Sequence, residues 1–292
     1  GHEICGEVLE IGADAHDAQH VAVGDAVHCI STLYCGRCRL CRSGNEHICL
    51  HYQLMGFDFA GAYAEYVAIP EIACKGLFKI PEGLSAAHAT FTDPLSDAIC
   101  GHKDIGIGLD QTVAVIGAGP VGIAHCALAR AQGASQVLLL ETAHNRLSLA
   151  DGVLGSDRMD YLEVTGDAGI AAVRKATDDF GADVVIVACS SDKAQEQAME
   201  MAAPRARVLF FGGLPKGTTH MRFPSNILHY QEVQVHGSYA SRYRDQVQAL
   251  DMLARDEGGI RGVVSEVIPL EEAPGAFDRI RAGEVLKVVV EP

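Results

Sequence analysis

Short apolar runs in the later part of the chain alternate with segments of helical spacing. We expect buried strands at Thr112–Ile116, Gln136–Leu140, Asp183–Ala188, Arg207–Phe211 and Val233–His236. We expect helices at Val121–Gln132, Asp167–Phe180 and Asp192–Ala203, which lie between several of these strands. Strands that alternate with helices predict βαβ units and a parallel sheet, so the fold class is α/β.

The two ends of the chain show other patterns. Ile4–Gly12 and Ala62–Pro70 alternate between apolar and polar residues with a period near two, which predicts strands of a β domain. The tail contains helix-like segments at Tyr243–Arg255 and Glu271–Ala282, and it finishes on the apolar run Leu286–Val290. The chain therefore combines a β-rich first part with a larger α/β part.

Composition excludes two classes of protein. The 292 residues carry 23 Lys and Arg against 38 Asp and Glu, a formal net charge of −15. A phosphate-backbone or anionic-membrane binder needs clustered positive charge, so we expect no nucleic-acid and no membrane partner. The longest apolar stretch, Thr112–Ala131, includes three glycines, a proline, His125 and Arg130, which favours a buried element over a membrane span. No signal-peptide pattern is visible, and we expect a cytoplasmic protein.

A glycine-rich turn follows the run that ends at Ile116. Gly117, Gly119 and Gly122 form a G-x-G-x-x-G motif between the predicted strand and the predicted helix, with Pro120 and Val121 inside it. The first glycine permits a sharp turn, the second lets a pyrophosphate approach the backbone, and the third lets helix and strand pack closely. The N-terminus of the helix then presents N–H groups to the phosphates. The competing interpretation is a tight turn in an unrelated α/β protein.

An acidic residue stands where such a site would meet a ribose. Glu141 lies nineteen residues after Gly122, at the end of the second predicted strand. A carboxylate there can accept both ribose hydroxyls and repels a 2′-phosphate, so we expect NAD rather than NADP. Arg146 could tolerate a phosphate, but we interpret it as a cover over the adenine.

Four of the ten cysteines lie close together in the sequence. Cys35, Cys38, Cys41 and Cys49 fall within fifteen residues. Their C-x-x-C steps favour a closed, tetrahedral, structural zinc site over an iron–sulfur cluster, whose common run has a shorter last gap and a proline after the last cysteine. The scattered cysteines are expected to be reduced core thiols: Cys5, Cys29, Cys74, Cys100, Cys126 and Cys189.

Together these motifs resemble the zinc-containing medium-chain dehydrogenase/reductase family of alcohol, polyol and threonine dehydrogenases. The resemblance rests on Gly1-His2-Glu3, the four-cysteine lobe, the dinucleotide turn, Gly61–Tyr66 and the tail Leu286–Val290. It implies a GroES-like β domain with a zinc lobe over residues 1–95 and a Rossmann, doubly wound parallel sheet over 96–238. It also implies a segment over 239–292 that returns to the first domain, and a homodimer or homotetramer.

The resemblance assigns site residues as well. His2 matches a catalytic-zinc ligand, Glu3 the adjacent carboxylate, and Asp93 a position usually held by Cys or Glu. Positions that match NAD contacts are Val121, Gly212, Gly213, Leu214, Ser238 and Tyr239. The Gly212–Leu214 turn follows a predicted buried strand, which places it at the carboxyl edge of the sheet, where ligands bind. An ordinary strand-to-loop turn is the alternative there.

One departure from the family changes the functional expectation. A further zinc-ligating Cys and the Ser or Thr of a proton relay lie upstream of Gly-His-Glu in the family, so we interpret the chain as N-terminally truncated. We expect a zinc-dependent oxidoreductase that transfers a hydride between a secondary alcohol and NAD, with a non-catalytic NAD-binding remnant as the alternative. We expect one tightly held zinc per chain rather than two. Candidate pocket residues are Thr32, Phe57 and Phe91, and histidines such as His16, His20 and His144 are expected at the surface.

Overall fold

A six-stranded parallel sheet forms the centre of the larger part of the molecule. The computed structural model describes residues 1–164, 166–217 and 220–292. The strands are β6 (Thr112–Ile116), β7 (Gln136–Glu141), β8 (Met159–Glu163), β9 (Ala182–Val187), β10 (Ala202–Phe210) and β11 (Gln234–Gly237). They lie in the order β11-β10-β9-β6-β7-β8, and every neighbouring pair is parallel. The predicted α/β class and the Rossmann sheet are confirmed.

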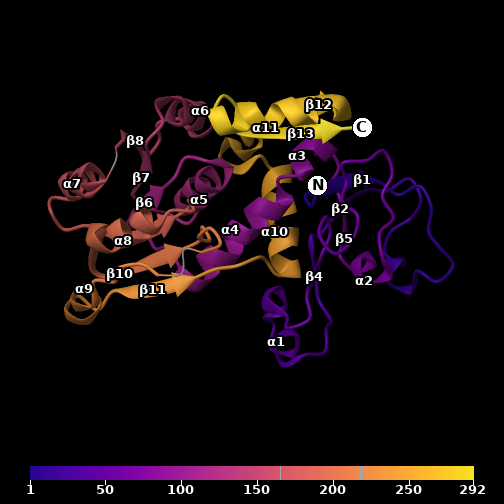
Figure 1. Cartoon of the computed structure of the whole chain (residues 1–292), viewed down its shortest axis with the longest axis horizontal. Coiled ribbons are helices and arrows are strands. Elements are labelled where there is room, and N and C mark those ends of the chain that lie inside the picture. The colour runs from indigo at the N-terminus through magenta and orange to yellow at the C-terminus, as the bar shows by residue number, and fades with distance from the viewer. Residues whose placement is uncertain (165, 218–219) are drawn as a thin grey trace.

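Helices cover both faces of this sheet (Figure 1). One face packs on α4 (Thr92–Ile105), α5 (Pro120–Ala131), α6 (His144–Leu154) and α10 (Tyr243–Ala254). The other packs on α7 (Asp167–Ala176), α8 (Asp192–Met201) and α9 (Ser225–Tyr230). Along β6, Val113 and Val115 face the first layer and Ala114 faces the second. Because both faces are covered, the central strands β6, β7 and β9 are apolar at most positions.

A smaller β-rich unit precedes the sheet. Its antiparallel strands are β1 (Ile4–Glu7), β2 (Ala26–Cys29) and β5 (Leu77–Lys79), in the order β1-β2-β5, and β3 (Thr32–Leu33) pairs with β4 (Gln53–Leu54). Short helices connect them: η1 (His16–Ala18), α1 (Arg39–Arg42), η2 (Glu46–Ile48), α2 (Glu71–Cys74) and α3 (Ala86–Ala89). Ile30, Leu33 and Met55 are fully buried in the core of this unit.

The C-terminal segment brings the end of the chain beside its beginning (Figure 1). After α10 come η3 (Glu257–Val263), β12 (Val264–Pro269), η4 (Leu270–Glu272), α11 (Ala273–Ala282) and β13 (Lys287–Glu291). β12 and β13 pair in parallel. The Lys287 ammonium forms an ion pair with the Glu3 carboxylate, a contact between β13 and the residue before β1.

Several predicted elements differ from the structure. Ala62–Pro70 is not a strand: among the described residues, its backbone–backbone bonds are one from the Ala62 N–H to the Gly1 carbonyl and one that the Pro70 carbonyl accepts from Ala73. Residues 62–69 line a cavity of about 1390 Å³ instead. The strand predicted over Ile4–Gly12 stops at Glu7. The helix that begins at Asp167 ends at Ala176, because Asp178 and Asp179 have positive φ. Sequence reasoning missed α4. Within the described residues, no helix is long and apolar enough to cross a membrane.

Candidate functional site

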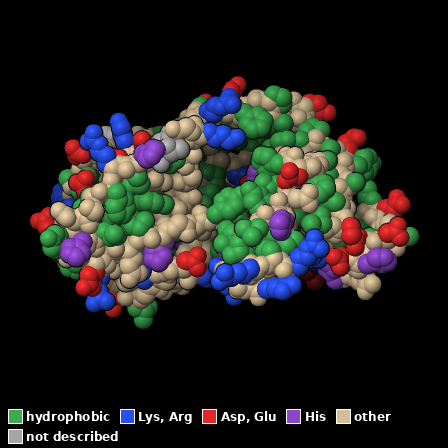
Figure 2. Space-filling view, turned by 60° about the horizontal axis from the view of Figure 1, so that its bottom comes forward, with side chains coloured by type: hydrophobic (Ala, Val, Ile, Leu, Met, Phe, Trp, Pro, Cys, Tyr) green, Lys and Arg blue, Asp and Glu red, His purple; other side chains and the backbone are tan. Residues whose placement is uncertain are grey.

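The parallel strands bring several predicted cofactor residues to one edge of the sheet. β6 pairs with β7 on one side and with β9 on the other, so the strand order reverses between β6 and β9. Ligands of doubly wound sheets bind at the carboxyl ends of the strands at such a point. Gly117, Glu141, Gly212 and Ser238 all follow or end strands at this edge. Figure 2 shows that the surface of the molecule is hollowed between its two halves.

The glycine-rich turn is open to solvent at Gly119 and closely packed at Gly122. Gly117 has a φ of +107°, which favours glycine, and its N–H donates to the carbonyl of Leu140. A Cβ on Gly122 would lie 1.8 Å from the Gly117 carbonyl oxygen, so α5 can approach the strand only with glycine there. A Cβ on Gly119 would meet no atom within 4 Å. The open space at Gly119 and the N-terminus of α5, formed by Pro120 and Val121, fit a pyrophosphate.

Glu141 is held against this turn. Its Oε2 accepts from the N–H of Ala118 at 3.0 Å, and its Oε1 accepts from the N–H groups of Thr142 and Ala143. Burial acts to raise the pKa of this carboxyl, but these hydrogen bonds outweigh it and lower the pKa below its usual range. An ionised carboxylate therefore stands beside the glycine-rich turn.

Arg146 has a partner that the sequence did not indicate. Its Nη2 donates to the carbonyl of Ile280 at 3.4 Å, and its side chain lies beside Gly283. Asn145, its neighbour on α6, donates to the carbonyls of Ala282 and Gly283. The two side chains thus join α6 to the end of α11, and the adenine contact of Arg146 stays a prediction.

The turns after β10 and β11 complete the same edge. The N–H groups of Phe211 and Gly212 both donate to the carbonyl of Val187, at 3.2 and 2.9 Å, so the chain folds back over the end of β9. A Cβ on Gly213 would meet open space, and Leu214 is half-buried. Ser238 follows β11, and the exposed ring of Tyr239 lies 6.4 Å from that of Tyr52. The contacts of these residues with a dinucleotide stay a prediction.

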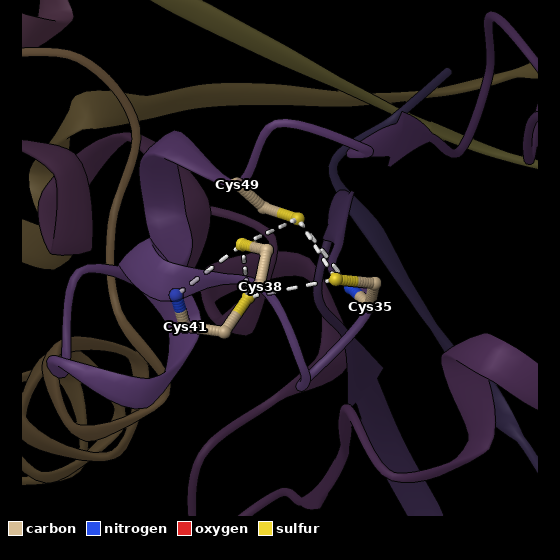
Figure 3. Close-up of side chains that lie close together, drawn as sticks. All are labelled: Cys35, Cys38, Cys41 and Cys49. Carbon is tan, nitrogen blue, oxygen red and sulfur yellow. Dashed lines mark hydrogen bonds between the residues drawn. The ribbon is translucent and has the colours of Figure 1, made fainter.

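The four cysteines of the lobe converge on one point (Figure 3). Cys38 caps α1, which carries Cys41, and Cys49 follows η2. The Sγ atoms of these residues and of Cys35 all lie within 4.8 Å of one another. The N–H of His51 donates to the Cys49 sulfur at 3.3 Å. N–H groups of Cys41 and Leu50 lower the pKa of the Cys38 thiol to about 6, which favours its thiolate.

This geometry fits zinc. Four sulfurs bound about 2.3 Å from a zinc ion at the corners of a tetrahedron lie about 3.8 Å apart. The sulfur pairs 38–41, 35–49, 38–49 and 35–41 are separated by 3.4, 3.6, 3.8 and 4.0 Å. With four protein ligands there is no open position for a substrate, so such an ion would stabilise the lobe.

A second cavity, of about 280 Å³, lies at the carboxyl edge of the sheet and contains part of the predicted catalytic set. His2 and Asp93 line it, together with Phe211, Ser238 and Tyr239. Glu3 does not line it and is paired with Lys287 instead. In the described part of the chain, His2, Glu3 and Asp93 do not form a group of three ligand atoms within 4.8 Å. As they stand, these residues do not fit a catalytic metal site.

Asp93 is the buried acid of this cavity. It lies on the first turn of α4, and its Oδ1 accepts a hydrogen bond from the Ser31 hydroxyl at 2.8 Å. Burial, reinforced by the nearby Glu3, raises its pKa. The predicted pocket residues Thr32 and Phe57 also line the cavity, whereas Phe91 is buried and lines the larger cavity of about 1390 Å³ instead.

Sequence reasoning missed another acid in the cavity and misplaced several histidines. Asp97 lies one helical turn after Asp93 and lines the same cavity. The signal was the i, i+4 spacing, which could be used only if a helix over Thr92–Ile105 had been predicted. His16, His20 and His144 are exposed as expected, but His28, His102 and His125 are buried. Of the scattered cysteines, Cys5 and Cys189 are partly exposed and the others are buried.

Comparisons with known proteins agree with this architecture. A family model described as the alcohol dehydrogenase GroES-like domain matches residues 1–82, and one described as zinc-binding dehydrogenase matches residues 120–255. The chain is 30% identical to an L-threonine 3-dehydrogenase of Bacillus licheniformis over 294 residues, which covers all of this chain and 81% of the relative. It is 27% identical to a D-xylulose reductase A of Aspergillus niger over 292 residues, covering 99% of this chain and 79% of the relative.

A solved structure of a related protein carries a nicotinamide cofactor. It is a protein from Sinorhizobium meliloti 1021, described as a zinc-binding dehydrogenase, and its structure was solved with NADP bound. The alignment covers all of this chain and 83% of that protein, with a TM-score of 0.87 and 29% sequence identity. The sequence relatives are alcohol oxidoreductases, and the cysteine cluster fits zinc. The chain belongs to the zinc-containing medium-chain dehydrogenase/reductase family of zinc- and nicotinamide-dependent alcohol oxidoreductases.

Proposed function

We propose that this chain transfers a hydride between the carbinol carbon of a small secondary alcohol and NAD. The observation that carries the proposal is one continuous edge: the glycine-rich turn, the turns after β10 and β11, and the cavity that contains His2 and Asp93. The bound dinucleotide supplies the hydride acceptor. The chain positions the alcohol beside it, and the cavity is of a size that suits a small molecule.

The residues that line the two sides of the cavity have different proposed roles. Phe211, Ser238 and Tyr239 line the cavity on the side of the sheet, where the nicotinamide would lie. His2 and Asp93 line it on the side of the β-rich unit, where they can hydrogen-bond the reacting hydroxyl. The four cysteines and their zinc would stabilise the lobe and take no part in the chemistry.

We propose NAD rather than NADP because of Glu141. Its carboxylate is ionised and stands beside the glycine-rich turn, where it would repel a 2′-phosphate. Calorimetric titration should show that NAD binds more tightly than NADP by at least about tenfold, roughly 1.4 kcal/mol. In Glu141→Gln, which keeps the hydrogen-bonding shape without the charge, that ratio should fall. Equal binding of both cofactors by the wild type would contradict the assignment.

A turnover screen tests the reaction itself. The protein would be incubated with NAD and a panel of polyols, sugars and threonine while NADH formation is followed by its absorbance. His2→Ala should reduce turnover, whereas His16→Ala, an exposed histidine of the same unit, should not. Turnover of no alcohol despite tight NAD binding would defeat the proposal.

That last outcome describes the second candidate function, a non-catalytic NAD-binding protein. The pairing of Glu3 with Lys287 favours it, because this pair withholds one of three predicted ligands from the cavity. Metal analysis adds an independent measurement: the described residues form one closed zinc site, so we expect about one tightly bound zinc per chain. Two tightly bound zinc ions per chain, together with turnover, would exclude the non-catalytic candidate.

A further inference from the structure

Asp97 is a second carboxylate in the substrate cavity. It lies on α4, four residues after Asp93, so both side chains are on one face of the helix. Both line the 280 Å³ cavity, and Asp97 is only partly covered because it opens into that space. Ser31 and Thr32 line the same cavity. A molecule bound there meets two carboxylates as well as hydroxyl groups.

Asp97 lies beside a network of buried polar side chains that includes Ser241. Burial, reinforced by the neighbouring Asp93, raises the pKa of Asp97, and the Ser241 hydroxyl opposes this rise. Ser241 Oγ accepts from Gln246 Nε2 at 3.0 Å and from the Ser96 hydroxyl at 2.8 Å. Gln246 Oε1 in turn bonds His28 Nε2 at 2.8 Å, and both of these side chains are fully buried. Since a carboxylate accepts several hydrogen bonds, Asp97 keeps acceptor positions free toward the cavity.

The cavity offers no cation to an acidic substrate. Among the described residues that line it, His2 is the sole basic side chain, and neither Lys nor Arg is present. The nearby Lys287 is paired with Glu3 outside the cavity. A carboxylate in the substrate would therefore face Asp93 and Asp97 with His2 as the sole basic side chain beside it, which is costly in a partly desolvated site. A hydroxyl or ammonium group would find acceptors instead.

We propose that Asp97 is a specificity-determining residue: it selects alcohols with a hydrogen-bond donor on the carbon next to the carbinol, and it excludes alcohols that carry a carboxylate. This inference rests on the proposed function, since it concerns the same cavity. It separates this chain from relatives named L-threonine 3-dehydrogenase, because threonine carries a carboxylate as well as an ammonium group. We expect threonine to be a poor substrate here.

Two matched pairs of alcohols test the selection. Butane-2,3-diol and butan-2-ol differ by the neighbouring hydroxyl, and 1-aminopropan-2-ol and L-threonine differ by the carboxylate. The wild type should favour the first member of each pair in kcat/KM by about 10- to 100-fold, the usual cost of leaving a buried polar group without its hydrogen bond or a carboxylate without a compensating charge. Asp97→Ala should reduce the diol preference at least about tenfold.

A second variant separates charge from shape. Asp97→Asn keeps an acceptor but cannot ionise, so it should retain part of the diol preference. The same variant should raise the kcat/KM of threonine relative to 1-aminopropan-2-ol by about tenfold. Asp104→Asn is the matched control, because Asp104 is on the same helix but outside the cavity, and it should change neither ratio.

Binding measurements keep this test independent of turnover. Each alcohol would be titrated calorimetrically into the wild type and the Asp97 variants, with and without NADH. Diol binding that depends on Asp97 without any turnover would support the inference and refute the proposed function. Ratios that are the same in wild type and Asp97→Ala, or a wild type that prefers threonine, would refute the inference alone. If none of the four alcohols binds or reacts, both are wrong.

Discussion

Replacing Gly122 with alanine should damage both the fold and the cofactor site. The new Cβ would lie 1.8 Å from the Gly117 carbonyl oxygen and 3.0 Å from its carbon. An ordinary contact needs roughly 3.5 Å, so α5 and the turn would have to separate by more than about 1 Å. Both partners are backbone, and neither can rotate away. Overpacking of this kind costs about 3 kcal/mol, offset by about 1 kcal/mol from the better helix propensity of alanine.

Two other glycines provide the controls. A Cβ on Gly119 meets no atom within 4 Å, and its φ of −78° is allowed for alanine, so Gly119→Ala should leave stability within about 0.5 kcal/mol. It should still weaken NAD binding at least about tenfold, because the methyl group occupies the space predicted for the pyrophosphate. Gly152→Ala, on the exposed side of α6 with no neighbour within 4 Å, should stabilise the protein by up to about 1 kcal/mol without changing NAD affinity.

The assay is denaturant unfolding of each variant, with calorimetric titration of NAD. Gly122→Ala should lower the unfolding midpoint by the equivalent of about 2 kcal/mol and reduce NAD affinity at least about a hundredfold. A Gly122→Ala protein with wild-type midpoint and NAD affinity would refute the reasoning from close contact. If Gly119→Ala binds NAD as tightly as the wild type, the pyrophosphate assignment is wrong.

Three further predictions concern the lobe, the buried histidines and the end of the chain. Cys49→Ser should lower the bound zinc well below one ion per chain and reduce the melting temperature. Cys74→Ser, outside the cluster, should keep the metal, and equal zinc content in the two variants would contradict the zinc site. His102 and His125 form a buried, hydrogen-bonded pair; burial lowers the pKa of His102 to about 4 and holds that of His125 well below its usual range. Below about pH 6.5 the unfolded chain binds protons on these two histidines, whereas the folded chain does not. The free energy of unfolding should therefore fall as the pH is lowered, and His102 alone should contribute about 3 kcal/mol of this loss between pH 6.5 and 4. Replacement of both histidines by glutamine should flatten this part of the pH profile, and an unchanged slope would contradict it. Lys287→Met should release Glu3 and raise zinc uptake near His2, as measured by competition with a chelator; unchanged uptake would show that the pair does not limit that site.

Features that depend on residues close in sequence could be predicted before the fold was known. The cysteine spacing brings sulfurs together within one short lobe, and the glycine motif determines a turn over six residues. Both follow from local backbone geometry, so composition and spacing were enough. The apolar runs of the parallel sheet were equally visible, because strands covered on both faces are apolar throughout. The strand predicted over Ala62–Pro70 failed because a strand also needs a neighbour to bond.

The tertiary structure decided every feature that joins distant parts of the chain. Glu3 meets Lys287 across the whole sequence, and Arg146 meets the end of α11. Asp97 could be assigned a role only from the structure, in which α4 places it in the cavity that Ser238 and Tyr239 also line. Which acids share a cavity, and whether a cation stands beside them, depends on packing between elements that no local pattern records. The sequence by itself determined the two local motifs and five of the six strands of the sheet, whereas β8 was not predicted. Folding determined which side chains share the cavity, because they come from elements far apart in the sequence.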